Sequence, residues 1–277
     1  MRKKLMRGAL LAAAIVAIVS SCVSCQPVSV GPWGRTTDKE ALVAQVAMRS
    51  AVQVRVTYSL DVSSIDPTKT HEMRFAFGSG TVVSDGKTSV VLTAWHACAP
   101  QRTAMYTVFG PELSVVAQTF AVITADGETL AASVRGGLPE SDLCTLDVVG
   151  DAGVPARIAS SPPPLGALVI YAGGPRGVWG LRMIPTFDGR YAGRSRFTVS
   201  GIERDGMLFT FPIAPGSSGS GVFYDGELVA IVVAGDEFEH LSYAIDVAAA
   251  AQLIGDRTTV EVSAPRDMVD VESPVWP

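Results

Sequence analysis

The chain has no surplus of positive charge. It contains 22 Lys and Arg residues against 27 Asp and Glu residues, which gives a formal net charge of −5 at pH 7. Residues 1–22 hold four basic residues and no acidic one, so their removal leaves 18 basic and 27 acidic residues, a charge of −9. Affinity for nucleic acid depends largely on Lys and Arg contacts to phosphates. The composition therefore argues against a nucleic-acid partner.

The N-terminus lacks an apolar run long enough for a comfortable membrane span. Its apolar stretch, residues 8–19, has 12 residues, whereas a transmembrane helix needs about 20. The stretch follows a basic start, which is typical of a secretory signal. The segment that ends at Cys22 resembles a bacterial lipobox, whose cysteine is diacylated; Cys25 is the weaker alternative. We expect an exported lipoprotein, tethered to a membrane and facing the periplasm or cell exterior, with ordinary secretion as the alternative.

Histidine is also scarce, and only one of the three histidines stands in a promising context. We expect His71 to lie in a polar loop after Pro67 and to be solvated. His240 precedes a short apolar segment, and we expect it in a surface loop. His96 ends an apolar strand, residues 89–93, and a short turn of helix up to Pro100 follows. Such a strand end can present an imidazole as a base instead of burying it.

Glycine and proline are plentiful, and one glycine-rich segment carries chemistry. The 27 Gly, 17 Pro and 48% hydrophobic residues favour many short strands and turns around a sizeable core. The segment Pro215-Gly-Ser-Ser-Gly-Ser-Gly221 is a tight turn of small residues between apolar strands. A serine there can act as a nucleophile, and backbone N–H groups can stabilise an oxyanion. Taken alone, the segment could equally be a flexible Gly/Ser loop.

The pattern Gly-x-Ser-Gly-Ser makes Ser218 the predicted nucleophile, with the N–H groups of Gly216 and Ser218 as the oxyanion hole. Ser217 and Ser220 are the competing choices. Asp142 opens the apolar strand 143–149 and is the predicted partner of the His96 ring.

Two other aspartates are weaker candidates for the acid. Asp126 lies in an Asp-Gly turn, and Asp147 lies inside a strand pattern. The chain order His, Asp, Ser excludes the other two known orders of serine-hydrolase triads.

With these residues identified, the chain resembles the trypsin/chymotrypsin superfamily, in its compact bacterial HtrA-like (Deg) branch. The resemblance covers roughly residues 50–254 and implies an all-β fold of two packed antiparallel barrels, with short N- and C-terminal helices. It also implies a serine endopeptidase whose substrate is a polypeptide. The segments that carry it occur in the family's order: Gly78–Ser84, Val91–His96, Ser141–Leu146, Leu165–Gly177, Ile213–Ser220 and Ser242–Ile245.

The resemblance also places a specificity pocket, with Pro212 at its base and Val233, Ala234 and Gly235 as one wall. No acid stands there, so cleavage after Arg or Lys is not expected, and small or medium apolar residues are the hypothesis. Val233 replaces a serine that supports the triad aspartate in many relatives.

Two further departures from the family pattern concern bulk near the predicted triad. Trp95 occupies a position that is usually small, and Ser220 stands in place of a glycine. A catalytically silent protease-fold module that binds peptides or envelope proteins is therefore the alternative function.

The predicted organisation follows from these assignments. A capping box at residues 37–40 starts an amphipathic helix that runs to about Arg49. We expect no PDZ-like domain. The expected segments are a lipoprotein signal at 1–22, a tether at 23–36, the helix and first barrel at 37–159, a proline-rich linker at 160–166, the second barrel and a closing helix at 167–257, and an acidic tail at 258–277.

Two of the four cysteines are predicted to form a disulfide. Cys98 follows His96 by two residues, and Cys144 follows Asp142 by two, so they become neighbours if the histidine and aspartate meet. An exported location permits such a bond. A zinc site built from the same four residues is the alternative, but it leaves the glycine-rich serine segment unexplained. We therefore expect no metal and no cofactor.

Overall fold

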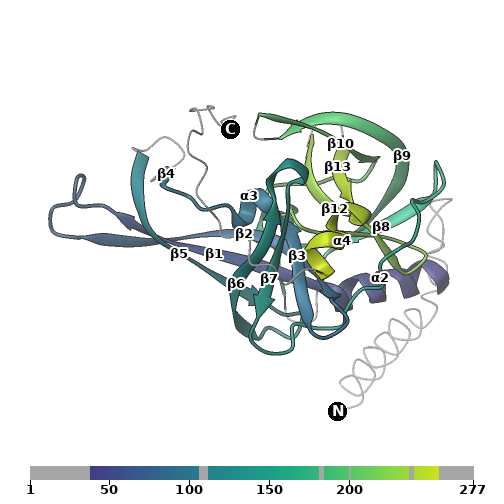
Figure 1. Cartoon of the computed structure of the whole chain (residues 1–277), viewed down its shortest axis with the longest axis horizontal. Coiled ribbons are helices and arrows are strands. Elements are labelled where there is room, and N and C mark those ends of the chain that lie inside the picture. The colour runs from purple at the N-terminus through teal and green to yellow at the C-terminus, as the bar shows by residue number, and fades with distance from the viewer. Residues whose placement is uncertain (1–37, 106–111, 181–183, 200, 237–239, 256–277) are drawn as a thin grey trace, which may run out of the picture. The chain divides into compact units, whose positions relative to one another are not determined.

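The computed structural model describes residues 38–105, 112–180, 184–199, 201–236 and 240–255 (Figure 1). The predicted signal with Cys22, the tether at 23–36 and the acidic tail at 258–277 lie outside the described residues. Within those ranges, no helix is long and apolar enough to cross a membrane.

The first half of the described chain is an antiparallel sheet that closes on itself. An additional β1–β5 pairing joins six strands in a ring, with β4 attached to β5. Val52, Val54 and Val56, at every second position of the first strand, share one buried cluster in the ring, as the period of a strand requires. In sheet order the strands are β1 (Ala51–Asp61), β2 (His71–Ser84), β3 (Ser89–Ala94), β7 (Leu143–Val148), β6 (Thr129–Leu138), β5 (Glu112–Ile123) and β4 (Thr103–Met105).

The second half is a closed six-stranded barrel. The predicted linker at 160–166 lies in the connection between β7 and this barrel. In barrel order the strands are β10 (Ile202–Phe209), β13 (Leu241–Asp246), β12 (Glu227–Asp236), β11 (Gly221–Tyr224), β8 (Leu168–Ala172) and β9 (Thr186–Val199). The expected all-β, chymotrypsin-like architecture is confirmed, with β4 as an addition to the first ring.

Short helices cover the barrels, as predicted (Figure 1). Helix α2 (Asp38–Ser50) contacts β8 and β11 of the second barrel. One turn of helix, α3 (Trp95–Cys98), follows β3, and the closing helix begins as η3 (Val247–Ala250) and continues as α4 (Ala251–Gly255). Two further 3-10 turns, η1 (Pro139–Ser141) and η2 (Pro175–Gly177), lie beside the candidate site.

One apolar cluster joins the two barrels. Leu92 and Leu143 of the first ring share a buried cluster with Leu228, Ile231 and Val233 of β12. Strand β12 is buried on both faces, because its remaining apolar residues fill the interior of its own barrel. The strands adjoining the histidine, the aspartate and the serine loop (β3, β7 and β11) therefore contribute to a common core.

Candidate active site

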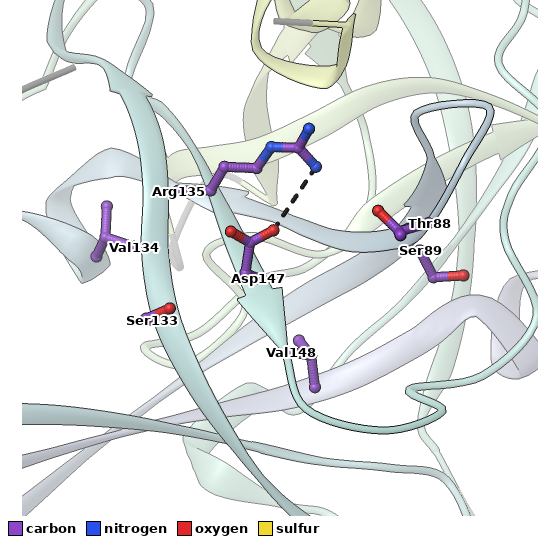
Figure 2. Close-up of a pocket in the computed structure, with 7 residues that line it drawn as sticks. All are labelled: Thr88, Ser89, Ser133, Val134, Arg135, Asp147 and Val148. Carbon is purple, nitrogen blue, oxygen red and sulfur yellow. Dashed lines mark ion pairs between the residues drawn. The ribbon is translucent and has the colours of Figure 1, made fainter. Parts of the chain in front are cut away.

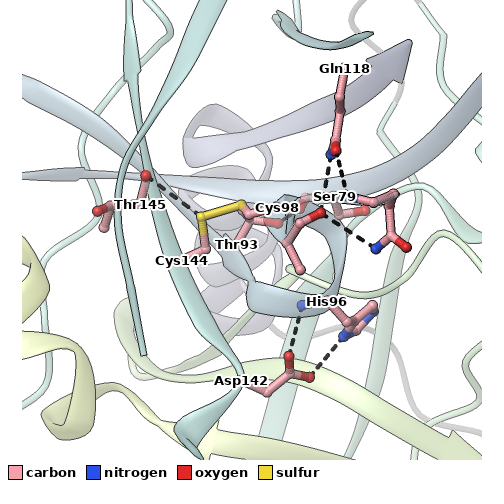
Figure 3. Close-up of a disulfide and its surroundings, with 10 residues drawn as sticks. Ser79, Thr93, His96, Cys98, Gln118, Asp142, Cys144 and Thr145 are labelled. Carbon is pink, nitrogen blue, oxygen red and sulfur yellow. Dashed lines mark hydrogen bonds and ion pairs between the residues drawn. A yellow bond between two sulfur atoms is a disulfide. The ribbon is translucent and has the colours of Figure 1, made fainter. Parts of the chain in front are cut away.

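Two hydrogen bonds join Asp142 to His96 (Figure 3), and a third joins Asp142 to the neighbouring Trp95. The Asp142 carboxylate accepts the His96 backbone N–H at 2.9 Å through Oδ1, and its Oδ2 lies 2.8 Å from His96 Nδ1. The Asp142 carbonyl accepts the N–H of Trp95 at 2.9 Å. The Asp142 side chain is 1% exposed and that of His96 is 34% exposed. A carboxylate at Nδ1 favours the tautomer that leaves Nε2 free to accept a proton.

The local backbone explains why these two residues meet. Asp142 adopts φ of +53° at the end of η1, a left-handed conformation that Asp tolerates better than most residues. His96 stands in the single turn α3, directly after β3, and β3 pairs with β7. The pairing of Ala94 with Leu143 brings the ends of both strands together.

The bulk of Trp95 is accommodated by a glycine. A Cβ placed on Gly137 of β6 would come within 2.2 Å of the Trp95 ring, so the ring lies directly on this glycine. The register of β6 against β7 shifts between Val134 and Gly136, next to this contact. Trp95 therefore packs against the first barrel without displacing His96.

A disulfide joins Cys98 and Cys144, as predicted, with a Cα–Cα distance of 6.5 Å. It connects α3 to β7 just beyond His96 and Asp142 (Figure 3). Both cysteines are buried. The bond also takes up the two thiols that the zinc alternative requires, and within the described ranges no group of three or more His, Cys, Asp or Glu residues could hold a metal ion.

The three serines of the loop between β10 and β11 have different surroundings. Ser217 and Ser220 are fully buried, whereas Ser218 is half-exposed. The Ser217 hydroxyl accepts the N–H of Ala214 at 3.3 Å and also bonds to Tyr171, whose pKa is raised to about 12 by burial against the opposing effect of this hydrogen bond. Of these three serines, only Ser218 is therefore accessible from outside the loop.

The N–H of Gly216 is directed away from the loop by the carbonyl that precedes it. The Pro215 carbonyl accepts the N–H of Arg176 in η2. Because the C=O and N–H of a trans peptide point in opposite directions, this bond turns the Gly216 N–H away from η2. Among the described residues, this N–H has no hydrogen-bond acceptor. The φ of +97° at Gly216, and a virtual Cβ 2.7 Å from the Gly174 carbonyl, require glycine there.

The N–H of Ser218 is directed outward in the same manner. The Ser217 carbonyl accepts the N–H of Ser220 at 3.0 Å, inside the turn, so the Ser218 N–H of the same peptide points out of it. It too lacks an acceptor in the described part of the chain, whereas the N–H groups of Ser217, Gly219 and Ser220 are all bonded. Two unpaired N–H groups beside an exposed hydroxyl are the donors that an oxyanion needs.

Ser79, which the sequence did not single out, fastens this loop to the first barrel. Its buried hydroxyl donates to the Gly216 carbonyl at 2.8 Å and accepts the N–H of Gly174 at 2.9 Å. Its backbone N–H donates to the Ser218 carbonyl at 2.8 Å. One residue of β2 therefore fixes the Gly216–Ser217 and Ser218–Gly219 peptides of the loop. The only signal in the sequence was a serine between two glycines of a buried strand.

The serine loop and the histidine strand are in contact. Thr93, three residues before His96, donates to the Ser79 carbonyl at 2.7 Å, and a Cβ on Gly219 would lie 2.3 Å from the Thr93 hydroxyl. Within the described residues, no hydrogen bond joins the Ser218 hydroxyl to the His96 ring. In unliganded enzymes such catalytic hydrogen bonds are often long and tighten when substrate binds.

The expected pocket residues lie on the other side of the loop, along β12. Val232 exchanges hydrogen bonds with Gly219 and Ser220, which places Val233, Ala234 and Gly235 next to the serine. Val233 is the extra residue where the β12–β13 register shifts, and it is buried in the core shared by the barrels. Pro212 is exposed, and its carbonyl accepts the Tyr171 hydroxyl at 2.9 Å.

Ile213 is a pocket neighbour that the sequence reasoning missed. A Cβ on Gly235 would lie 2.4 Å from Ile213 Cδ1, so the Ile213 side chain occupies the space against this glycine. Its position directly after Pro212 was the available signal. The wall beside the serine is therefore apolar, with no charged side chain among Pro212, Ile213 and 233–235.

The weaker candidates from the sequence lie elsewhere. Asp147 lines a surface pocket together with Arg135, whose Nη1 is 3.6 Å from Asp147 Oδ1 (Figure 2). The other residues of this pocket come from β3, β6, β7 and the turn before β3, and none belongs to the candidate site. Asp126 lies in the β5–β6 turn. His240 is exposed before β13, as expected. His71 is also exposed, as expected, but it is the first residue of β2 and not part of a loop.

Comparison with known proteins identifies the family. Residues 78–231, more than half of the chain, match the trypsin-like peptidase domain. The chain belongs to this family. A search of curated proteins gives no match.

Solved structures of the Rv3671c protease from M. tuberculosis share the fold of this trypsin-like domain. Its active form superposes with a TM-score of 0.59 at 18% identity, over 79% of this chain and 85% of that chain. An inactive form of a serine-to-alanine mutant gives a TM-score of 0.55 at 19% identity, over 76% and 88%. Another inactive form gives 0.55 at 19% identity, over 78% and 93%.

Proposed function

We propose that the protein is a serine endopeptidase that cleaves polypeptides through Ser218, His96 and Asp142. The observation that carries the proposal is the half-exposed Ser218 flanked by two outward, unpaired N–H groups, in a loop bound to the strand that presents the His96–Asp142 pair. Membership of the trypsin-like peptidase family supports the same conclusion.

In the proposed reaction, Ser218 Oγ attacks the carbonyl carbon of the scissile peptide while His96 Nε2 takes the hydroxyl proton. The carbonyl oxygen becomes an oxyanion and accepts the N–H groups of Gly216 and Ser218. His96 then gives the proton to the leaving amine, and the C–N bond breaks to yield an acyl-enzyme. Water, deprotonated by His96, hydrolyses the ester and restores Ser218.

Asp142 acts through His96 in this scheme. Its carboxylate accepts from both the backbone and the ring of His96, which fixes the tautomer and stabilises the imidazolium formed during attack. The hydroxyl that often supports this aspartate in relatives is replaced by Val233. The second bond, from the His96 backbone N–H, supplies the carboxylate with a substitute donor.

We propose that the residue before the scissile bond is small or medium and apolar. Pro212, Ile213 and residues 233–235 present no charge to neutralise Arg or Lys, and burying an unpaired cation is costly. The Ile213 side chain lies against Gly235 and leaves less room in the proposed pocket than Ala234 and Gly235 alone would provide.

We also propose that the N-terminal segments direct the protein to a membrane. A signal at 1–22 with lipidation at Cys22 and a tether at 23–36 would hold the catalytic unit at a membrane that faces the periplasm or cell exterior. Metabolic labelling with an alkyne fatty acid tests this point, because Cys22→Ser abolishes labelling if the assignment is correct, whereas Cys25→Ser does not.

Hydrolysis of an unstructured protein such as casein tests the enzymatic proposal. Ser218→Ala is expected to lower kcat by a factor of about 10⁵ or more with an unchanged melting temperature, because the residual rate comes from binding and the oxyanion hole alone. Ser220→Ala is the matched control and retains activity. Full activity of Ser218→Ala would refute the assignment of the nucleophile.

A catalytically silent peptide-binding module is the second candidate. The missing Ser218–His96 hydrogen bond, within the described residues, and Val233 at the supporting position favour it. A well-folded wild-type protein that binds peptides and never cleaves them would support this alternative.

A further inference from the structure

A buried cation lies at the junction of the two barrels, outside the proposed triad. Arg204 of β10 is 5% exposed and is the single buried Lys or Arg within the described ranges. Its hydrogen-bond partners there are carbonyl oxygens and not a carboxylate. Removing a cation from water without an opposing charge is costly. The reason for its burial therefore lies in the groups that it holds.

The guanidinium of Arg204 donates to three carbonyl groups. Its Nη1 donates to the carbonyls of Val199 at 2.5 Å and Ile202 at 3.0 Å, on either side of the turn that joins β9 to β10. Its Nη2 donates to the Pro139 carbonyl at 2.7 Å, in η1 of the first barrel. The planar fork of Arg suits this division, because its nitrogens point in fixed directions. One side chain of the second barrel therefore holds a turn of the first.

The Pro139 carbonyl also shapes the backbone at Asp142. It accepts the N–H of Asp142 at 3.2 Å, which closes the single turn of η1. Asp142 ends this turn with φ of +53°, a conformation that a residue other than Gly keeps only when its surroundings fix it. Arg204 Nη2 and the Asp142 N–H share one acceptor. The cation therefore restrains the turn that sets the Asp142 conformation.

The conformation of Asp142 in turn sets its contacts with the histidine segment. Its carbonyl accepts the Trp95 N–H at 2.9 Å, and its carboxylate bonds to the backbone and the ring of His96. A rotation of η1 would displace the carbonyl and the carboxylate together, because both belong to Asp142. The series of hydrogen bonds that starts at Arg204 and passes through Pro139 therefore ends at the His96 ring.

We propose that Arg204 is a positioning residue for the reaction, which holds the Pro139 carbonyl and thereby keeps the Asp142 carboxylate in place at His96. The inference rests on the proposed peptidase function. Arg204 acts through Asp142 and not on the substrate, so its loss should lower kcat and leave KM unchanged. A misplacement of about 1 Å at a catalytic group costs about 10²-fold in rate. The expected fall in kcat is therefore about 10- to 100-fold.

Three variants of the full-length protein test the proposal. Arg204→Met keeps an unbranched side chain but removes the donors and the charge. Arg204→Lys keeps a cation that can still donate to the Pro139 carbonyl. Phe197→Leu is the matched control, because Phe197 pairs with Arg204 in the β9–β10 ladder and is buried in the core shared by the barrels. Its side chain has no group that could hydrogen-bond to η1.

Two readouts are measured for each variant. The first is kcat and KM for the hydrolysis of casein. The second is the downfield proton NMR resonance of the hydrogen bond between His96 Nδ1 and Asp142, which requires no turnover. Arg204→Met should lower kcat by about 10- to 100-fold at constant KM and broaden the resonance or shift it upfield. Arg204→Lys should restore the resonance and most of kcat, and Phe197→Leu should lower Tm but keep both.

Several results would overturn the proposal. They are a folded Arg204→Met with the wild-type resonance and kcat, an equal loss in Phe197→Leu, or a wild type without the resonance. If Arg204→Met does not fold, Arg204→Gln takes its place, because its amide ends two bonds short of the guanidinium nitrogens and cannot reach Pro139. A wild type that shows the resonance but hydrolyses no casein would refute the peptidase proposal alone, because the resonance reports the position of Asp142 independently.

Discussion

Replacement of Ser79 by alanine tests how the serine loop is held in shape. The substitution removes the hydroxyl that donates to the Gly216 carbonyl and accepts from the buried Gly174 N–H, and it leaves both groups without those partners. A buried polar group that loses its partner costs about 1–3 kcal/mol. We expect the free energy of unfolding to fall by about 2–4 kcal/mol, which lowers Tm by about 5–15 °C for a domain of this size.

The same substitution should slow the chemistry. Without the Ser79 hydroxyl the peptide between Gly216 and Ser217 is less constrained, so the Gly216 N–H is held less firmly toward the oxyanion. Complete loss of one such donor costs about 10²–10³ in kcat. Since the Arg176–Pro215 bond remains, we expect about a tenfold fall in the acylation rate, with little change in KM because the interaction forms mainly in the transition state.

The assay is the burst phase of a p-nitrophenyl ester, measured together with a thermal melt. Ser220→Ala is the matched control, because Ser220 is equally buried but its hydroxyl has no partner in the described structure. That variant should keep its Tm and its burst rate. An unchanged burst rate in Ser79→Ala would refute the reasoning, and an equal loss in both variants would assign the effect to packing.

Two further predictions concern stability. Cys98→Ala/Cys144→Ala opens a loop whose ends are 46 residues apart, and the chain-entropy relation gives a decrease of about 4 kcal/mol in the free energy of unfolding. Urea denaturation against the oxidised wild type measures this decrease, and an unchanged midpoint would contradict the prediction. Hydrogen bonds from the Thr88 and Lys87 backbone, followed by Arg135, hold the pKa of Asp85 well below its usual value. The stabilisation by the Asp85 carboxylate is therefore complete above about pH 4 and is lost as the pH falls toward the lowered pKa. The difference in Tm between wild type and Asp85→Asn should be constant from about pH 5 to 7 and shrink in stronger acid. A difference that widens in acid would contradict this reasoning.

The contact between His96 and Asp142 could be predicted because it depends only on sequence features next to each residue. Each follows or precedes a short apolar strand, and the two cysteines stand at the same offset from them, so pairing of β3 with β7 brings all four together. The helix at 38–50 was likewise readable from its capping box and apolar spacing.

The hydrogen bonds of Ser79 to the serine loop and the full length of β2 could not be predicted in this way. Ser79 bonds to residues 95 and 137 positions away, and no local pattern encodes such a contact. The strand β2 begins at His71 because it pairs with the whole of β1, whereas its polar start and nearby proline favour a loop. The sequence around Trp95 did not predict that its ring would pack on Gly137, because this contact depends on tertiary packing.

Reaction of the full-length protein with a fluorophosphonate probe, followed by peptide mapping, tests the central claim most directly. The probe modifies a serine only when a base activates it and an oxyanion hole receives the phosphonyl oxygen. The account predicts a single adduct on Ser218 that is lost in His96→Ala. A folded wild-type protein that remains unmodified, or that is modified at Ser217 or Ser220, would contradict it.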